Sequence, residues 1–429
     1  MLDSEVLLGL LEKKGFKIIE EPEGADAAII NTCGFIKEAK QESVDLILQL
    51  AKLKKERKIK KLVVSGCLSQ RYAIELTDEI DEIDGMFGSS DFTKIPDEID
   101  KLLGGGKVKE VSETPEFLYD HSYDRKLLTL EHFAYLKIQE GCSNKCSYCV
   151  IPALKGALRS RTIESVVKEV QTLVSDPRLK ELVLIGQDTT SFGLDRAEKN
   201  VLVKLLKEIS PLMEGKWIRL LYTHPAHFTG ELIDIIKRTD NICDYIDLPI
   251  QHINDRILRE MNRRASKSDI ISIISDLRTA IDDLIIRTSV IVGFPGETEE
   301  EFNELVDFIK ETKFDRLGAF LYSREEGTPA YDFPDQVPEK VKQERLDVIM
   351  KLQQEISSEK NNALVGKLLD VLIDEDEGSE PGKYTGRSYM DAPEVDGIIY
   401  VTGKDLKLGD FTKVRITGSM EYDLVGEAI

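Results

Sequence analysis

A repeated alternation of strand and helix patterns in the middle of the chain most restricts the folds open to it. Six short apolar strand patterns recur from Phe133 onward, with helical patterns between them. They cover 133–138, 182–185, 217–221, 245–248, 287–292 and 316–321. A complete eight-stranded (βα) barrel typically takes about 250 residues and eight such units. Six units favour a partly open (βα)6 barrel, which we expect at 128–358.

The two ends of the chain carry different patterns. Residues 1–115 alternate helical segments with strand patterns at 27–31, 62–65 and 85–88, which predicts an open parallel α/β sheet. The polar, Gly-rich stretch 104–125 is typical of a linker. Residues 361–429 alternate apolar and polar positions between glycines, which predicts a small antiparallel β-barrel. We therefore expect an α/β protein of three domains.

Composition limits the class of partner and the compartment. The 79 acidic and 58 basic residues give a net charge of −21, which argues against a protein that grips a long phosphate backbone. The chain has no long apolar span and begins with acids rather than the basic residues of a secretory signal. We expect a cytoplasmic protein without a membrane segment. In that reducing compartment its six cysteines favour metal ligation over disulfides.

Three of the cysteines lie within eight residues of one another. Cys142, Cys146 and Cys149 have the spacing C-x3-C-x2-C, in the loop that follows the first predicted barrel strand. Such a loop can wrap a 4Fe-4S cluster, hold three irons by thiolates and leave the fourth open. A structural zinc site needs four protein ligands, and neither a fourth Cys nor a His is near in sequence. The triplet therefore predicts a 4Fe-4S cluster.

These residues resemble the radical S-adenosylmethionine (SAM) superfamily. Tyr148 matches the aromatic residue before the third cysteine, and 289–297 resembles the glycine-containing motif at the fifth barrel strand. The resemblance implies that SAM binds the open iron and is cleaved to a 5′-deoxyadenosyl radical. It also implies SAM contacts from Tyr148 and Gly293, since a glycine lets the backbone approach the adenine.

Over its whole length the chain resembles the radical SAM methylthiotransferases, which replace C–H by C–S–CH3. Cys33 and Cys67 each follow a predicted strand, at the sheet edge where ligands bind. They match two of the family's three N-terminal cysteines, which implies a second 4Fe-4S cluster. The family's first strand and first cysteine precede a motif that lies here at Asp3, so we expect the 1–115 domain to lack them. The resemblance also identifies 361–429 as a TRAM barrel that recognises the substrate.

The motifs are most similar to the branch that modifies an aspartate of small-subunit ribosomal protein twelve. They are the segments 151–161, 186–190, 247–252 and 391–397, with Lys155 where the branch commonly has Arg. Residues 361–429 contain 14 acidic and 7 basic residues, a net charge of −7 that favours a basic protein over RNA. We expect methylthiolation of the aspartate β-carbon. The alternatives are a tRNA adenosine methylthiotransferase and a non-catalytic iron-sulfur adaptor of the ribosome.

The same resemblance supplies the remaining site residues and partners. It implies SAM contacts from Gln187, Gln251 and Arg161, although Arg161 is equally explained as a solvated charge. No side chain is needed as acid or base, because the clusters and SAM carry the chemistry. A low-potential reductant such as flavodoxin or ferredoxin is implied, and tRNA is not an expected partner. His224 and His227 are expected to position a loop, and Cys243 to pack in the core.

Overall fold

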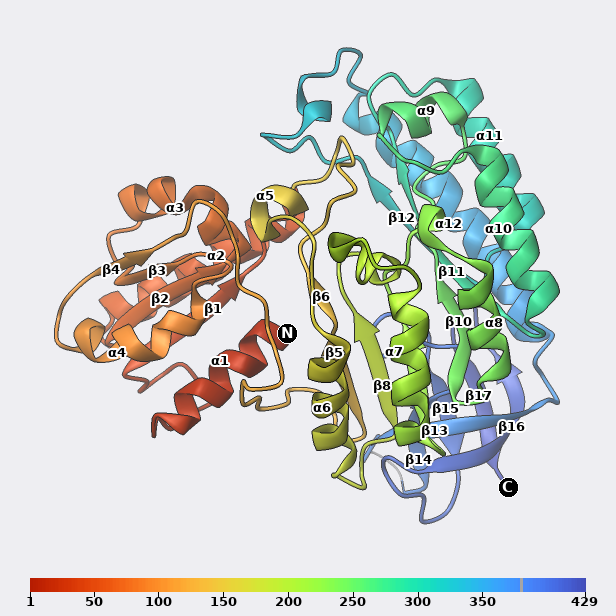
Figure 1. The fold of residues 1–429 in the computed structure, drawn as a ribbon, viewed down its shortest axis with the longest axis horizontal. Coiled ribbons are helices and arrows are strands. Elements are labelled where there is room, and N and C mark those ends of the chain that lie inside the picture. The colour runs from red at the N-terminus through yellow and green to blue at the C-terminus, as the bar shows by residue number, and fades with distance from the viewer. Residues whose placement is uncertain (379–380) are drawn as a thin grey trace. The chain divides into compact units, whose positions relative to one another are not determined.

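A computed structural model describes residues 1–378 and 381–429, and the chain forms two compact units (Figure 1). Unit 1 consists of Met1–Leu128 together with Gln139–Arg161 and Ser323–Tyr331. Unit 2 consists of Thr129–Ile138, Thr162–Tyr322 and Asp332–Ile429. The cysteine triplet therefore belongs to the same unit as Cys33 and Cys67.

Unit 1 is built on a four-stranded parallel sheet in the order β1-β2-β3-β4, as the predicted open parallel sheet requires. Its strands are β1 (Ala27–Thr32), β2 (Lys61–Gly66), β3 (Gly85–Phe87) and β4 (Val108–Glu110). The prediction of a linker over 104–125 was wrong where β4 lies. Only three residues long and mostly polar, β4 carries too little apolar pattern to be recognised from sequence.

Within the described part of the chain, five α-helices belong to unit 1, and α2 and α3 pack apolar residues on this sheet. The five helices are α1 (Leu2–Lys13), α2 (Lys37–Lys55), α3 (Cys67–Glu79), α4 (Ile95–Leu103) and the short α5 (Ile151–Lys155). Both α2 and α3 contact β1 and β2. Ile47 and Leu50 of α2 are buried with Ile30 and Val64 of the strands and Leu76 of α3 in one core.

Unit 2 contains the six-stranded parallel sheet predicted from the βα repeats, in the order β12-β11-β10-β9-β8-β5 (Figure 1). Its strands are β5 (Phe133–Lys137), β8 (Glu181–Ile185), β9 (Trp217–Leu220), β10 (Ile242–Asp247), β11 (Ile285–Val292) and β12 (Arg316–Leu321). The chain direction brings the loops after all six strands to one edge. In parallel α/β sheets this carboxyl edge is the ligand-binding edge.

Amphipathic helices connect these strands. They are α6 (Ile163–Val174), α7 (Val201–Ile209), α8 (Gly230–Arg238), α9 (Asp255–Glu260), α10 (Lys267–Ala280), α11 (Glu299–Thr312) and α12 (Glu339–Asn362). Helix α11 begins with a capping box in which Thr298 and Glu301 satisfy each other's backbone N–H groups. That cap fixes where the loop after β11 ends.

The C-terminal region is a closed barrel of five strands, as the alternating pattern predicted. They are β13 (Leu368–Asp376), β14 (Lys383–Arg387), β15 (Ile399–Thr402), β16 (Phe411–Ser419) and β17 (Leu424–Ala428). Most neighbouring strands are antiparallel, while β15 and β17 pair in parallel. Its core residues Val371 and Ile416 are buried in one cluster with Val183 and Tyr245 of the six-stranded sheet.

A chain of buried ion pairs accompanies this apolar core. Glu181 accepts from Arg219 and from Arg387, each at 2.6 Å, and Arg387 also donates to Asp374 at 2.8 Å. Asp374 lies 2.7 Å from His132. Burial raises the pKa of Asp374, but His132 and Arg387 outweigh that effect and hold it below the usual value. Asp374 is therefore a structural residue and not part of the acidic surface.

Among residues 1–378 and 381–429, no helix has both the length and the apolar character needed to span a membrane.

Candidate functional site: the cysteine loop and its surroundings

The cysteine triplet occupies a loop whose two ends are held together. Strand β6 (Gln139–Glu140) pairs antiparallel with β7 (Arg159–Ser160), so the chain returns to its starting point after the loop. Inside this ribbon the Cys142 N–H donates to the Gly156 carbonyl at 3.1 Å. The thiols are thus presented by a closed loop rather than by a flexible connection.

Gly141 is required where this loop closes. Its φ of +74° is costly for any residue with a Cβ. A Cβ built there would also lie 2.2 Å from the Ala157 carbonyl oxygen and 2.6 Å from that of Gly156. Both obstacles are backbone atoms, so a side chain at this position has to separate the two sides of the loop.

The three thiols of the triplet suit a cluster better than a single ion. Cys142, Cys146 and Cys149 are all partly exposed. Thiolates around one zinc ion lie about 4 Å apart, because each Zn–S bond is about 2.3 Å. A closed zinc site also needs four protein ligands, and the loop supplies three cysteines. Three thiolates on a closed loop can each bind one corner iron of a 4Fe-4S cluster and leave the fourth iron open.

Cys33 and Cys67 converge at the carboxyl edge of the unit 1 sheet, as their positions predicted. Thr32 and Gly66 are paired across β1 and β2, and each cysteine is the next residue. A Cβ on Gly34 would lie 2.7 Å from the Cys67 carbonyl oxygen, so the two loops are in direct contact. The Ser43 hydroxyl accepts from the Cys33 N–H at 3.0 Å and donates to its carbonyl at 3.1 Å.

A buried cation lies beside this cysteine pair. Lys155, at the end of α5, donates to Asp3 at 2.8 Å and lies 3.9 Å from Glu140, two residues before Cys142. Burial raises the pKa of the Cys67 thiol, while the charge of Lys155 opposes that effect. Lys155 therefore keeps the positive charge expected at this position and places it near the Cys67 thiol.

The five residues implied as SAM contacts are divided between the two units. Tyr148 and Arg161 belong to unit 1, whereas Gln187, Gln251 and Gly293 belong to unit 2. Arg161 is 2% exposed and lies over the Tyr119 ring, 4.8 Å from its centroid, so the interpretation as a solvated charge was wrong. Their role as SAM contacts stays a prediction.

Gln251 and Gly293 lie at the carboxyl end of β11. Gln251 has a φ of +68°, donates its N–H to the Ser289 carbonyl at 2.9 Å and accepts from the Ile291 N–H at 2.8 Å. Gly293 has a φ of +72°, and a Cβ there would lie 2.3 Å from the Lys342 side chain. Both positive φ values therefore lie beside one strand end, where Gln251 is tied to β11 and the position of Gly293 leaves no room for a side chain next to Lys342.

Glu297 organises the same loop and was not among the predicted site residues. Its carboxylate accepts from the N–H groups of Gly293 and, at 3.0 Å, of Phe294. Burial raises the pKa of Glu297 to about 7. The sequence feature that could have identified Glu297 is its position four residues after Gly293. A carboxylate at that distance can reach back to the N–H groups of a turn at a strand end.

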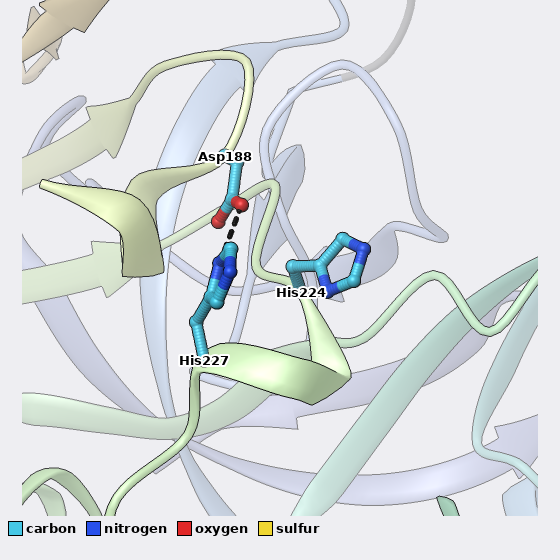
Figure 2. A group of neighbouring side chains, drawn as sticks. All are labelled: Asp188, His224 and His227. Carbon is cyan, nitrogen blue, oxygen red and sulfur yellow. Dashed lines mark hydrogen bonds and ion pairs between the residues drawn. The ribbon is translucent and has the colours of Figure 1, made fainter. Parts of the chain in front are cut away.

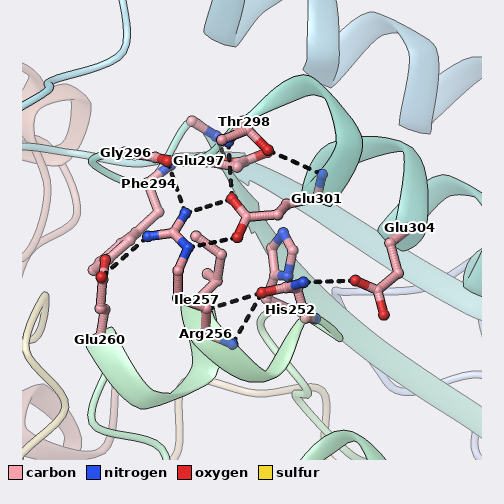
Figure 3. A network of polar contacts seen from close by, with 12 residues as sticks. His252, Arg256, Ile257, Glu260, Phe294, Gly296, Glu297, Thr298, Glu301 and Glu304 are labelled. Atoms are coloured by element: carbon pink, nitrogen blue, oxygen red, sulfur yellow. Dashed lines mark hydrogen bonds and ion pairs between the residues drawn. The ribbon is translucent and has the colours of Figure 1, made fainter.

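Arg256 joins this loop to the one after β10 (Figure 3). It donates to the Gly296 carbonyl at 2.7 Å and to the Glu301 carboxylate at 2.5 Å. His252 is fully buried in the same network and accepts from the Asn254 N–H at 3.0 Å. Burial lowers the pKa of His252 to about 4, so the ring is neutral and structural at physiological pH.

His224 and His227 meet Asp188 at the carboxyl ends of β8 and β9 (Figure 2). Their ligand atoms lie within 4.8 Å, so the structure supplies the third group that sequence spacing did not. However, His224 Nδ1 accepts from the Ala226 N–H at 3.1 Å, and Asp188 accepts from Thr190 at 2.6 Å and lies 2.8 Å from His227. These bonds already position both loops, as expected for the two histidines.

Cys243 is separate from both cysteine sites. It lies in β10 of unit 2, is 5% exposed and belongs to the apolar core shared with the C-terminal barrel. Burial raises the pKa of its thiol to about 12. The expectation that Cys243 packs in the core is confirmed.

Comparison with known proteins identifies the family. Residues 136–309 match the radical SAM superfamily, 365–429 the TRAM domain and 1–88 the uncharacterized protein family UPF0004. The ribosomal protein uS12 methylthiotransferase RimO of Clostridioides difficile is 48% identical over 438 residues, covering 100% of this chain and 96% of that protein. The chain belongs to the uS12 methylthiotransferase family. The RimO protein of Thermoanaerobacter is 49% identical, covering 99% of this chain and 96% of that protein.

A solved structure supports the same fold outside this family. The radical SAM methyltransferase TsrM of Kitasatospora setae, solved with cobalamin and a 4Fe-4S cluster, has a TM-score of 0.56 and 15% identity. The match covers 86% of this chain and 77% of that one. The chain therefore has a radical SAM fold. Its membership of the methylthiotransferase family shows that it is an enzyme.

Proposed function

We propose that this chain is a radical SAM methylthiotransferase that converts an aspartate of ribosomal protein uS12, the small-subunit ribosomal protein twelve, to its 3-methylthio form. The observation that carries the proposal is the closed loop of Cys142, Cys146 and Cys149 in one compact unit with the paired Cys33 and Cys67. Two thiol sites in one unit suit a reaction that needs one cluster for SAM cleavage and another for sulfur transfer.

The chain's own residues hold and orient the cofactors. Cys142, Cys146 and Cys149 would hold the 4Fe-4S cluster that binds SAM, with Tyr148 beside them on the loop. When bound, the clusters and SAM supply the 5′-deoxyadenosyl radical and the methylthio group. The β6–β7 ribbon fixes the loop, which lowers the reorganisation needed when the cluster and SAM bind.

Loops at the carboxyl edge of the unit 2 sheet would receive the adenosyl part of SAM. The turn at Gly293 has a positive φ, and the Glu297 carboxylate fixes it by accepting from the N–H groups of Gly293 and Phe294. Gln251 is locked across β11 by two backbone hydrogen bonds. Gln187 follows β8 at the same edge. Arg161, buried against Tyr119, would act by positioning the end of the cluster loop.

Cys33 and Cys67 would hold the second 4Fe-4S cluster. The two thiols supply two of the three thiolates of the family's pattern, and the Ser43 hydroxyl orients the first of them. Lys155 would balance part of the negative charge of thiolates and sulfide at this edge, because it is a buried cation whose charge acts on the Cys67 thiol and favours its thiolate form.

The partners follow from the same chemistry. A chain with a net charge of −21 attracts a basic ribosomal protein and repels RNA, which places tRNA outside the proposed substrates. Reductive cleavage of SAM needs an electron from a low-potential protein such as flavodoxin or ferredoxin. Thiolate ligands and a ribosomal substrate suit a reaction in the cytoplasm.

The test is a reaction with anaerobically reconstituted enzyme, SAM, dithionite and purified ribosomal protein uS12. We expect 5′-deoxyadenosine and a methylthio-aspartate peptide detected by mass spectrometry. Cys146→Ala should abolish both, whereas Cys243→Ala, which removes a core thiol, should retain both. A methylthio group on tRNA instead of the protein would transfer the proposal to the RNA branch, and intact 5′-deoxyadenosine formation by Cys146→Ala would overturn it.

A further inference from the structure

Strand β12 (Arg316–Leu321) differs from the other strands of its sheet. All six of its residues retain some exposure, whereas each of the other five strands contains buried residues. It is the last strand in the sheet order and, among the described residues, it pairs only with β11. In the sheet order, one edge of β12 has no strand partner among the described residues (Figure 1).

The strand itself carries few of the features that block pairing, although α12 packs on it. Natural edge strands carry charged residues, prolines or bulges, or are very short. After Arg316 the sequence of β12 is Leu-Gly-Ala-Phe-Leu, and all six residues pair with β11 without a register shift. Phe320 exposes 49% of its surface. A straight, apolar, exposed edge strand is the arrangement that binds an extended peptide by strand addition.

A cavity lined by polar and apolar residues lies at the beginning of this strand. Its volume is about 280 Å³, and its lining includes Arg316 and Gly318 of β12, Gln353 and Ser357 of α12, and Asp396. All belong to unit 2. The cavity thus lies between the start of β12, helix α12 and the C-terminal region, the part of the chain that the family resemblance assigns to substrate recognition.

Three polar atoms of this lining have no hydrogen-bond partner within residues 1–378 and 381–429: Arg316 Nε, Gln353 Oε1 and Ser357 Oγ. Gln353 and Ser357 are each 1% exposed. Buried polar groups without partners are rare, because each costs about 1–3 kcal/mol. The set offers one donor, one acceptor and one hydroxyl, which match the C=O and N–H of a peptide group.

We propose that an extended segment of the basic ribosomal protein adds as a strand to the free edge of β12 and places a peptide group in this cavity. The inference rests on the proposed function and names the docking site for that substrate. At roughly 3.3 Å per residue, the three steps from Gly318 to Leu321 carry the bound segment about 10 Å toward the carboxyl edge of the sheet.

The experiment measures binding of purified ribosomal protein uS12 to the full-length enzyme, with hydrogen exchange read over residues 316–321. Phe320→Lys places a charge on the edge, and Ile271→Lys is the matched control because Ile271 is 44% exposed on α10. Ser357→Ala removes one unpartnered hydroxyl without breaking a bond within the described protein. Circular dichroism and thermal melting establish that each variant is folded.

We expect the ribosomal protein to slow exchange in 316–321. We expect Phe320→Lys to bind the ribosomal protein at least tenfold more weakly than wild type, and Ile271→Lys to bind like wild type. Ser357→Ala should bind about threefold more weakly, because one hydrogen bond is worth about 1 kcal/mol. Unchanged exchange, or equal affinities of Phe320→Lys and Ile271→Lys, overturns the docking site while wild-type methylthiolation persists. If exchange in 316–321 slows as the enzyme concentration rises without the ribosomal protein, the edge binds a second copy of the enzyme, and the docking site is also overturned. Absence of both binding and modification by wild type overturns the proposed function itself.

Discussion

Replacing Gly141 by alanine tests whether closure of the cysteine loop is needed for the iron-sulfur site. The substitution adds a single methyl group, but at a φ of +74° and 2.2 Å from the Ala157 carbonyl oxygen. Gly215→Ala is the matched control, because Gly215 has a φ of +71° and no atom within 4 Å of the position that an added methyl group would take. The two variants share the backbone penalty and differ in the collision.

The expected magnitudes follow from these contacts. A left-handed backbone costs a residue with a Cβ roughly 1–2 kcal/mol, which is the whole effect expected for Gly215→Ala. Gly141→Ala also separates the loop and breaks the bond from the Cys142 N–H to the Gly156 carbonyl, worth about 1 kcal/mol. We therefore expect a loss of roughly 2–4 kcal/mol, with a shift in Tm of about 2–4 °C for each kcal/mol.

The assay compares Tm, iron content after anaerobic reconstitution and 5′-deoxyadenosine formation for the two variants and wild type. We expect Gly141→Ala to lose iron and SAM cleavage, and Gly215→Ala to retain both despite a small loss of stability. Equal Tm values for the two variants, with full iron in each, would refute the argument that loop closure positions the three thiols.

Four other variants give separate readouts. Cys33→Ala or Cys67→Ala should retain 5′-deoxyadenosine formation and lose the methylthio product, and loss of both with an intact triplet cluster would contradict two separate steps. Asp374→Asn should lower the free energy of unfolding at pH 7 by about 3 kcal/mol. The fold holds the pKa of this carboxyl below its usual value, so the charged carboxylate stabilises the wild type only while it stays ionised. The difference between wild type and variant should therefore shrink in thermal melts below about pH 4. The double variant Glu375→Lys, Asp376→Lys changes two exposed positions and should leave Tm unchanged. It should associate with the ribosomal protein more slowly than wild type at low salt. Equal association rates would contradict electrostatic attraction by this barrel.

Local pattern was sufficient to predict most of the fold. The strands of the six-stranded sheet carry continuous apolar or β-branched runs, so their positions were recovered to within a few residues. Strands β14 and β17 were not predicted, because Lys383–Arg387 and Leu424–Ala428 are short and each contains a glycine. Their pairing is imposed by closure of the barrel, which a local pattern does not record.

In the candidate site too, some residues could be identified from local sequence and others only from the tertiary structure. Spacing identified the triplet, and strand ends identified Cys33 and Cys67, because both signals are local in sequence. The burial of Asp374 depends on His132 and Arg387, which no local pattern brings to it. The contact between Asp188 and His227 likewise joins two loops that follow different strands, and only the tertiary structure brings them together.

The most direct test of the central claim follows the hydrogen atom removed from the substrate. Ribosomal protein uS12 with deuterium on the β-carbon of its aspartates is incubated with the reduced enzyme and SAM. The account predicts that deuterium appears in 5′-deoxyadenosine as the methylthio-aspartate forms. Product formation with deuterium-free 5′-deoxyadenosine would contradict radical abstraction at that carbon.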